Sequence, residues 1–540
     1  MSENKQSYMK SAAILAATAI VVKIISGIYK IPLYNMIGDE GTGHFQVTYT
    51  IFTLLFTIST AGIPVALSRQ ISAAVAVGQR GLVRRYFSMA LPAFAVVGAF
   101  FSVVMFIYAD KLALFMNDGQ ATAAIRILSP AVFFVCVVSV YEGYGQGHEN
   151  MYPTAAKQLL EVSCKLIFGL SIVWFLLRAG YPSPVVTAGA ISGVTIGLGL
   201  ALPVMVYFKR KIDRTFYRNR KHDDAGTTDS RRHVLLSIFR VSIPITLGAS
   251  FMNILTLLDT KFVLLRLQTG AGFAPENAVA LYGVYSKGLS LLVLPSFLIV
   301  PITISIIPAV SAALATHRYQ HAKEVMASSM KLTNLFAMPA GVGLCILAYP
   351  IFNVLYPHSN PVGPTLLSIF GIAAYFVCMQ LMTTALLQAS GREKIPLFTF
   401  PVGGIIQIVL DWVLVGNPSI GIIGSPIGTL TCYFIITVLN FVFIAVTVRH
   451  KPNFAPAFIK PALCTAAMGV TAWSVYELLA KVGAKALGTG HLALAVYLTG
   501  AIVAAVVVYG ALVIATKTVT REDMKFVPKG EIIASFLKIK

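Results

Sequence analysis

Apolar runs long enough to cross a membrane recur along almost the entire chain, and they restrict its fold more than any other feature. A transmembrane helix needs about 20 consecutive apolar residues, whereas a transmembrane β-strand shows alternation over about 10. Of the 540 residues, 57% are hydrophobic and 12% are charged, and the mean hydropathy is +0.78. A soluble core does not need this much apolar surface. The sequence therefore predicts an all-α polytopic membrane protein.

Hydropathy divides the chain into about fourteen spans in three groups. The first six lie at residues 11–36, 44–66, 86–109, 122–146, 154–178 and 184–208. The next six lie at 234–265, 279–313, 327–355, 362–388, 396–416 and 420–448, and a final pair lies at 458–480 and 491–516. We therefore expect two six-helix lobes around a central cavity, followed by two further helices. The predicted parts are an N-terminal lobe at 1–208, a basic cytoplasmic linker at 209–233, a C-terminal lobe at 234–450, and the last helix pair with a cytoplasmic tail at 451–540.

The linker contains the longest clearly polar stretch of the chain, at 209–232, with nine Lys and Arg residues and four Asp residues. Loops rich in Lys and Arg stay on the cytoplasmic side of a membrane. With this loop inside, the segments on the cytoplasmic side have 30 Lys and Arg residues and those on the other side have 5, so both termini are predicted to be cytoplasmic. The first span is too long for a signal peptide, and we interpret it as an uncleaved helix. The net charge of +21 follows from this orientation, and no nucleic-acid partner is expected.

Two short matches indicate an internal repeat. The motif Phe134–Cys136 returns as Phe376–Cys378 at an offset of 242 residues. The pair Ile63–Pro64 returns as Ile307–Pro308 at an offset of 244. These matches predict that the two lobes have the same topology, as in transporters with two lobes around a central cavity.

Charged side chains inside membrane spans are costly and mark functional positions. Lys23, Lys165 and Lys287 lie near the middle of three different spans, and together they predict a shared, hydrated cavity. Lys30 follows Lys23 by seven residues and therefore lies on the same helix face. Lys30 either joins the cavity or extends to the outer interface, and the sequence leaves both alternatives open.

Gln158, Glu161 and Lys165 form one stripe along a helix, because they are three and four residues apart. Glu161 and Lys165 either neutralise each other or contact a ligand. Asp259 and Asp411 lie in the outward halves of their spans. Each of these two carboxylates either binds a coupling cation or pairs with a lysine, and the sequence does not decide between the two.

Other features of the spans have simpler interpretations. Three charged residues lie close enough to span ends to anchor helices at the interface: Arg126, Glu142 and Arg240. One predicted span contains Pro295, Pro301 and Pro308, which give either a fixed kink or a bending element for alternating access. All six cysteines fall inside spans, so neither disulfides nor a thiolate metal site is expected. No P-loop or HExxH motif occurs in the sequence. We expect no enzyme activity, no cofactor and no metal, and coupling to an ion gradient or the membrane potential.

Several short runs resemble the polysaccharide-transport branch of the MOP flippase superfamily. They are Ile37–Gly43, Ala61–Ser68, Tyr144–Gly147 with the segment that follows it to Glu161, and Tyr282–Gly288. The resemblance covers essentially the whole chain, and it is closest to the branch of stage V sporulation and Gram-positive MurJ-type lipid II flippases. It implies two lobes in the bacterial cytoplasmic membrane and transport of an undecaprenyl-pyrophosphate-linked saccharide from the inner to the outer leaflet.

The resemblance also implies roles for individual residues. Lys23 stands where MurJ-type proteins have an arginine in the first helix, and Lys287 stands where they have a basic residue in the eighth. Tyr29 takes the place of a second arginine, with Lys30 beside it. Glu142 replaces a basic residue that is common in the family. These differences leave the identity of the lipid-linked saccharide open.

The leading hypothesis is a flippase for a lipid-linked oligosaccharide, with the peptidoglycan precursor lipid II as the first candidate. Lysines near the midplane suit a pyrophosphate, because ammonium groups replace water around its charge. One alternative is a MATE-type cation-coupled drug antiporter, which would use buried carboxylates without neighbouring lysines. The other is a non-transporting scaffold that contacts membrane lipids and cell-wall synthesis proteins. The sequence does not distinguish a sporulation role from vegetative wall growth.

Overall fold

The computed structural model describes residues 2–218, 231–448, 451–486, 488 and 490–518, and within these ranges it contains helices and no strands. The α-helices are α1 (Ser2–Thr60), α2 (Ile63–Ala76), α3 (Arg80–Ile107), α4 (Ala109–Phe115), α5 (Thr122–Gly147), α6 (Tyr152–Cys164), α7 (Leu170–Arg178), α8 (Ser183–Arg218), α9 (Arg231–Thr269), α10 (Pro275–Leu292), α11 (Ser296–Ala315), α12 (Tyr319–Ile346), α13 (Ala348–Leu355), α14 (Gly363–Ala389), α15 (Pro396–Leu414), α16 (Gly424–Thr447), α17 (Pro456–Ala486) and α18 (His491–Ala515). The predicted all-α class is confirmed.

Twelve segments of the described chain are long and apolar enough to cross a membrane, or thirteen if a bent helix pair counts as one more. The protein is therefore a multi-pass membrane protein, while the count of fourteen spans stays a prediction. The predicted linker begins inside α8, which continues to Arg218, and its middle part at 219–230 lies outside the described residues.

Helix α1 combines the first two predicted spans, and it is not straight. Gly38 has a φ of 73°, a left-handed conformation that glycine adopts without strain. The rings of Tyr34 and Phe45, on either side of Gly38, have centroids 6.2 Å apart. In a straight helix these two residues would be separated by about 16 Å along the axis. The chain therefore reverses direction at Gly38.

Contacts divide the chain into two compact units. Unit 1 comprises residues 1–268 and 273–283, and unit 2 comprises residues 269–272 and 284–540. Helix α9 thus belongs to unit 1 by its contacts, whereas the sequence-based boundary assigned it to the C-terminal lobe. The hydroxyl of Thr246 on α9 accepts a hydrogen bond from the backbone N–H of Gly62 at 3.1 Å. Asn253, also on α9, donates to the hydroxyl of Thr57 at 3.0 Å.

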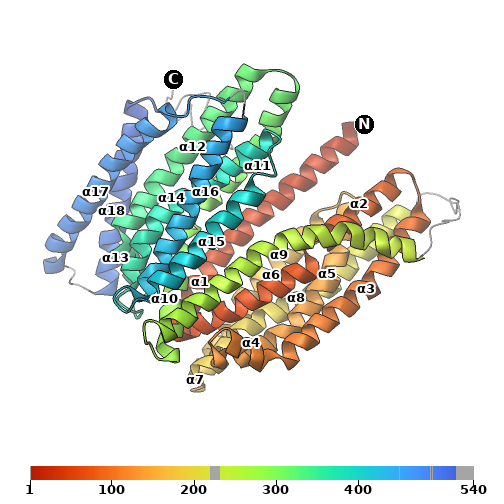
Figure 1. The fold of residues 1–540 in the computed structure, drawn as a ribbon, viewed down its shortest axis with the longest axis horizontal. Coiled ribbons are helices and arrows are strands. Elements are labelled where there is room, and N and C mark those ends of the chain that lie inside the picture. The colour runs from red at the N-terminus through yellow and green to blue at the C-terminus, as the bar shows by residue number, and fades with distance from the viewer. Residues whose placement is uncertain (1, 219–230, 449–450, 487, 489, 519–540) are drawn as a thin grey trace. The chain divides into compact units, whose positions relative to one another are not determined.

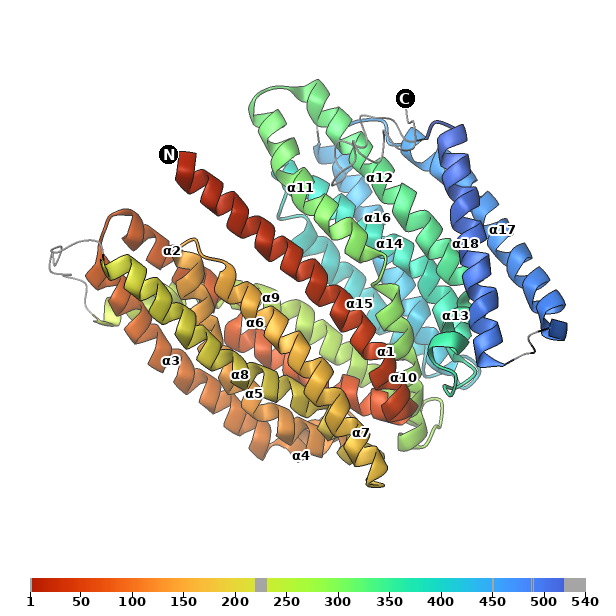
Figure 2. The ribbon, with the colours of Figure 1, turned by 180° about the vertical axis from the view of Figure 1, so that it is seen from behind.

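Unit 1 is organised around α5, which packs against α1, α2, α3 and α8 (Figure 1). Most of its residues are buried, as expected for a helix with neighbours on every side. Figure 2 shows α6 and α7 running beside α8. Helix α8 approaches α6 closely because Gly193 and Gly197 have no side chain at the contact. A Cβ on Gly197 would lie 3.1 Å from the Cβ of Cys164 on α6, and a Cβ on Gly193 would lie 2.9 Å from the backbone nitrogen of Gly169, between α6 and α7. Small residues permit this close packing of membrane helices.

Unit 2 is organised around α14 in the same way. Helix α14 packs against α11, α12, α13 and α16, and α15 packs on α16. Helices α17 and α18 pack on each other, with α17 against α12 and α18 against α13 (Figure 2). The two motifs of the internal repeat therefore occupy equivalent positions. Phe134–Cys136 lies on α5 and Phe376–Cys378 on α14, while the Ile-Pro pairs lie on α2 and α11, which pack against these central helices.

Two predicted spans are broken in the structure. The span at 279–313 consists of α10 and α11, and Pro295 is the N-cap residue of α11. Proline at this position removes a donor, and the single span predicted from the sequence is divided here into two helices. The span at 327–355 consists of α12 and α13, which are bent by 77°.

Candidate functional site

The strongest concentration of buried charge in unit 1 lies on α6 and on the π-helical turn that follows it, Lys165–Gly169. Lys157, Glu161 and Lys165 are spaced four residues apart and face the same side of the helix. Lys165 is the first residue of the π-helical turn. Such turns are rare, and they occur frequently at functional sites because they change the direction of the side chains that follow.

These side chains form a continuous chain of ion pairs that reaches α5. The Nζ of Lys165 lies 2.6 Å from Oε1 of Glu161, and the Nζ of Lys157 lies 3.6 Å from Oε2 of the same carboxylate. Lys157 also lies 3.7 Å from Oε1 of Glu142 on α5. Glu142 and Lys157 are buried, and Glu161 and Lys165 are largely so. Charges in this environment are retained when each has a partner.

Helix α1 supplies the groups around Lys165. The Nζ of Lys165 lies 5.9 Å from the ring centroid of Tyr49, at the outer limit of a cation–π contact. Lys30 is close enough to Lys165 for the two ammonium groups to repel each other. Tyr29 is buried beside the π-helical turn, where a Cβ on Gly169 would lie 3.2 Å from its hydroxyl.

We call the set Lys30, Glu142, Lys157, Glu161 and Lys165 the charge cluster. With every member ionised, it has three positive and two negative charges, so one positive charge is in excess. An anion that binds here would relieve the repulsion between Lys30 and Lys165. A small organic cation would increase this repulsion, because both ammonium groups already share one region.

Of the residues predicted from the sequence, the structure brings together Lys30, Glu161 and Lys165. Lys23 is half-buried on α1, two turns before Lys30. Gln158 is half-buried on α6 and forms no side-chain hydrogen bond among the described residues. The predicted roles of these side chains in ligand binding stay predictions.

Lys287 lies in unit 2 and is almost fully buried, with 2% of its surface exposed. Its Nζ lies 3.5 Å from the hydroxyl of Ser359 and 5.2 Å from the ring centroid of Tyr356. The neighbouring Tyr285 stacks at a tilt on Phe370 and shares a hydrogen bond with Thr429 at 3.2 Å. The ammonium group of Lys287 therefore lies beside a hydroxyl group and an aromatic ring of its own unit.

The two aspartates also lie in different units. Asp259 is half-buried on α9 in unit 1, two residues before Lys261, whose Nζ lies 3.5 Å from the ring centroid of Phe115. Asp411 is completely buried on α15 in unit 2. Its carboxylate fills the space left by Gly428 on α16, since a Cβ there would lie 2.3 Å from Oδ1. Within the described part of the chain, no group of three or more His, Cys, Asp or Glu residues could hold a metal ion.

Two members of the charge cluster were not recognised from the sequence. Glu142 was interpreted as an interfacial anchor because it lies near the end of its span, yet its side chain is buried against Lys157. Lys157 lies in the first turns of its span, and its position in the sequence does not mark it as a buried charge. The spacing Lys157, Glu161, Lys165 was the available signal, because a Lys-Glu-Lys series at intervals of four places all three on one face.

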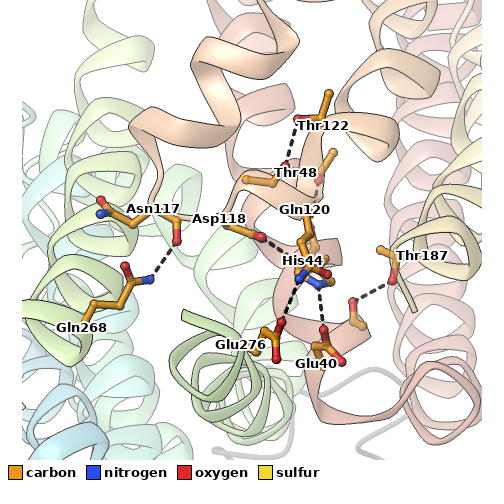
Figure 3. A network of polar contacts seen from close by, with 12 residues as sticks. Glu40, His44, Thr48, Asn117, Asp118, Gln120, Thr122, Thr187, Gln268 and Glu276 are labelled. Carbon is orange, nitrogen blue, oxygen red and sulfur yellow. Dashed lines mark hydrogen bonds and ion pairs between the residues drawn. The ribbon is translucent and has the colours of Figure 1, made fainter. Parts of the chain in front are cut away.

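A second buried polar network lies where α1 reverses, and no pattern in the sequence predicts it (Figure 3). The Nδ1 of His44 lies 2.8 Å from both carboxylate oxygens of Asp118, and its Nε2 lies 3.5 Å from Glu40. Nearby, Gln268 at the end of α9 donates to the backbone carbonyl of Asn117 at 2.8 Å. These contacts connect the α1 reversal with the turn after α4 and with the end of α9.

The comparisons with known proteins agree with this fold. Several proteins of Bacillus subtilis (strain 168) are similar to the chain, including the three described next. Stage V sporulation protein B is 25% identical over 97% of this chain and 98% of its own length. The uncharacterized membrane protein YabM is 25% identical over 80% of this chain and 79% of its own. Lipid II flippase MurJ is 22% identical over 75% of this chain and 76% of its own.

Solved structures share the fold, including the two described next. Lipid II flippase MurJ in an inward closed conformation has a TM-score of 0.69, with 12% identity, over 93% of this chain and 99% of that one. An inward-facing multidrug resistance transporter of the MATE family, in the MOP superfamily, has a TM-score of 0.60, with 17% identity, over 83% of this chain and 98% of that one.

The family model described as "Polysaccharide biosynthesis protein" matches residues 8–314, more than half of the chain. This range includes the whole of the charge cluster. Together with the MurJ-like fold, it confirms the resemblance drawn from the sequence. The chain belongs to the polysaccharide biosynthesis protein family.

Proposed function

We propose that this protein is a flippase that moves an undecaprenyl-pyrophosphate-linked saccharide from the inner to the outer leaflet of the bacterial cytoplasmic membrane. Lipid II is the first candidate substrate, and both termini are proposed to be cytoplasmic. The observation that supports this function best is the charge cluster, which has an excess positive charge and includes Lys165 on a π-helical turn of a membrane-spanning segment. On this proposal the protein is a transporter and not an enzyme.

The chemistry of the cluster explains how it would hold and release an anion. Lys165 is neutralised by Glu161 when no substrate is present. The free energy needed to keep these charged side chains inside the bilayer is therefore low. A pyrophosphate that approaches Lys30 and Lys165 would compete with Glu161 for the ammonium group. The saccharide-bearing head group would then cross beside these lysines while the lipid tail stays in the bilayer.

Three further residues are proposed to contact the substrate: Lys23 on α1, Gln158 on α6 and Lys287 on α10. Asp259 and Asp411 are proposed either to bind a coupling ion or to form ion pairs. Cell-wall synthesis proteins are the proposed protein partners.

Native mass spectrometry of the full chain in detergent tests substrate binding. The protein is offered lipid II, undecaprenyl phosphate and a cationic dye in separate experiments. We expect selective binding of lipid II, weakened about tenfold or more by Lys165→Ala, because a hydrogen bond to a charged group contributes about 1.5–3 kcal/mol. Lys23→Ala and Lys287→Ala are measured beside it, since the proposal expects weaker binding from each.

The matched control is Lys394→Ala, which removes an exposed lysine in the turn before α15. This variant should bind lipid II as the unmodified protein does. Dye binding that survives Lys165→Ala, in the absence of lipid II binding, would favour the MATE-type drug antiporter instead. Binding of none of the three ligands would contradict the proposed substrate class and favour a scaffold role.

A further inference from the structure

A separate pocket of about 530 Å³ lies at the far end of α8 from the α1 reversal. It is formed between the turn that joins α5 to α6 and the last turns of α8. Its lining residues include His148, Asn150, Tyr152, Phe208, Lys211 and Phe216. None of these residues belongs to the charge cluster.

The wall of this pocket is aromatic and well packed. The ring of His148 lies 4.5 Å from that of Tyr144 and 4.9 Å from that of Phe216, which it meets edge-on. The guanidinium group of Arg80, at the start of α3, lies 5.2 Å from the ring centroid of Phe216. The wall is thus aromatic, and the positive charge of Arg80 lies close to one of its rings.

Lys211 supplies a positive charge at the pocket itself. The only acidic residue of α8 is Asp213, and both of its carboxylate oxygens are already used. Oδ1 accepts a hydrogen bond from the hydroxyl of Tyr144 at 2.6 Å, and Oδ2 pairs with the Nζ of Lys209 at 2.6 Å. Lys211 forms no ion pair with the described residues, and Glu149, in the same turn as His148, is exposed and does not line the pocket.

The pocket lies in a strongly basic region. Eight basic residues occupy the first turns of α3 and the last turns of α8: Arg80, Arg84, Arg85, Lys209, Arg210, Lys211, Arg214 and Arg218. Burial lowers the pKa of His148, so its ring is neutral near pH 7 and the positive charge comes from the lysines and arginines. Asn150 accepts a hydrogen bond from the backbone N–H of Tyr152 through Oδ1, which leaves its amide N–H₂ group as a donor at the pocket.

We propose that this pocket binds the head group of an anionic glycerophospholipid of the surrounding membrane. Lys211 and the amide of Asn150 would contact the phosphate, and an acyl chain would lie along Phe208 and the aromatic wall. Basic pockets between transmembrane helices at the cytoplasmic surface attract anionic lipid head groups in this way. Aromatic residues at the ends of membrane helices lie at the depth of the head groups, which places the pocket within reach of a lipid.

The test compares lipid binding to the full chain by native mass spectrometry in detergent. Phosphatidylglycerol and phosphatidylcholine with identical acyl chains are offered at equal concentrations. We expect preferential binding of phosphatidylglycerol, reduced about fivefold by Lys211→Gln, because one basic residue near the membrane surface contributes about 1 kcal/mol. The matched control Arg214→Gln removes the same charge from an exposed position one turn further along α8, outside the pocket lining, and should leave binding unchanged.

A charge-retaining variant and a competition experiment with inorganic phosphate separate the possible causes of lost binding. Lys211→Arg retains the charge and should retain binding, which separates loss of the charge from loss of the folded protein. Millimolar inorganic phosphate should not displace phosphatidylglycerol, since the acyl chain contributes to binding. Equal loss in Lys211→Gln and Arg214→Gln would show diffuse attraction to the basic region and would overturn the proposal. Displacement by inorganic phosphate, or equal binding of the two lipids, would overturn it as well.

Discussion

Replacement of Glu161 by Gln is expected to lower the melting temperature of the protein and to abolish most transport. The carboxylate lies 2.6 Å from Lys165 and 3.6 Å from Lys157. Removal of one member of a buried ion pair typically costs about 3–5 kcal/mol, because the other member stays buried without compensation. Lys157 keeps Glu142 at 3.7 Å, so Lys165 is the residue that loses its partner. Thermal unfolding in detergent and lipid II translocation in liposomes measure the two effects.

A double variant separates the structural role of this pair from its role in transport. Glu161→Gln combined with Lys165→Gln removes both charges and leaves two amides in their place. We expect it to recover most of the lost stability, since no uncompensated charge remains, but not the transport activity. Unchanged thermal stability in the single Glu161→Gln variant would contradict the ion-pair geometry.

Replacement of Gly283 by Ala is expected to prevent unit 1 from folding correctly. A Cβ on Gly283 would lie 1.8 Å from the backbone carbonyl oxygen of Asp39 and 2.9 Å from the backbone nitrogen of Gly43. These are backbone atoms, so α10 and the reversal of α1 would have to separate. Overpacking of this kind costs about 1–3 kcal/mol or more, and we expect the upper end of that range. Yield after size-exclusion chromatography and the melting temperature measure the loss.

Gly248→Ala is the matched control for this substitution. Gly248 lies inside α9 in the same unit, and a Cβ there would have no neighbour within 4 Å. Alanine favours a helix over glycine by about 0.8–1 kcal/mol, so this variant should be as stable as the unmodified protein or slightly more so. Equal behaviour of the two alanine variants would show that α1 and α10 do not touch at Gly283.

Much of the fold could be predicted because hydropathy reports directly on membrane crossing. The all-α class and the apolar segments follow from local sequence. The reversal of α1 was predicted only as a loop between two spans, because a single glycine in a left-handed conformation leaves no hydropathy signal. The assignment of α9 to unit 1 also depends on side-chain contacts, such as Asn253 with Thr57, that no periodicity reveals.

The charge cluster was predicted only in part, because the sequence shows the spacing of residues within a helix but not the contacts between helices. Glu161 and Lys165 are neighbours on one helix, and their pairing follows from a spacing of four residues. The contribution of Glu142 comes from another helix, so only the packing of α5 against α6 could show it. For Lys287, the sequence shows the position of the charge but not its surroundings. Its position in the middle of a span was visible in the sequence, but its burial beside Ser359 and Tyr356 was not.

The measurement that tests the central proposal most directly is translocation of fluorescent lipid II in liposomes that contain the purified protein. Lipid in the outer leaflet is detected with a quencher that does not cross the membrane. We expect the protein to move lipid II between leaflets, Lys394→Ala to match it, and Lys165→Gln to slow the movement about tenfold or more through loss of a charged hydrogen bond. Movement no faster than in protein-free liposomes, or full activity in Lys165→Gln, would contradict a flippase that operates through the charge cluster.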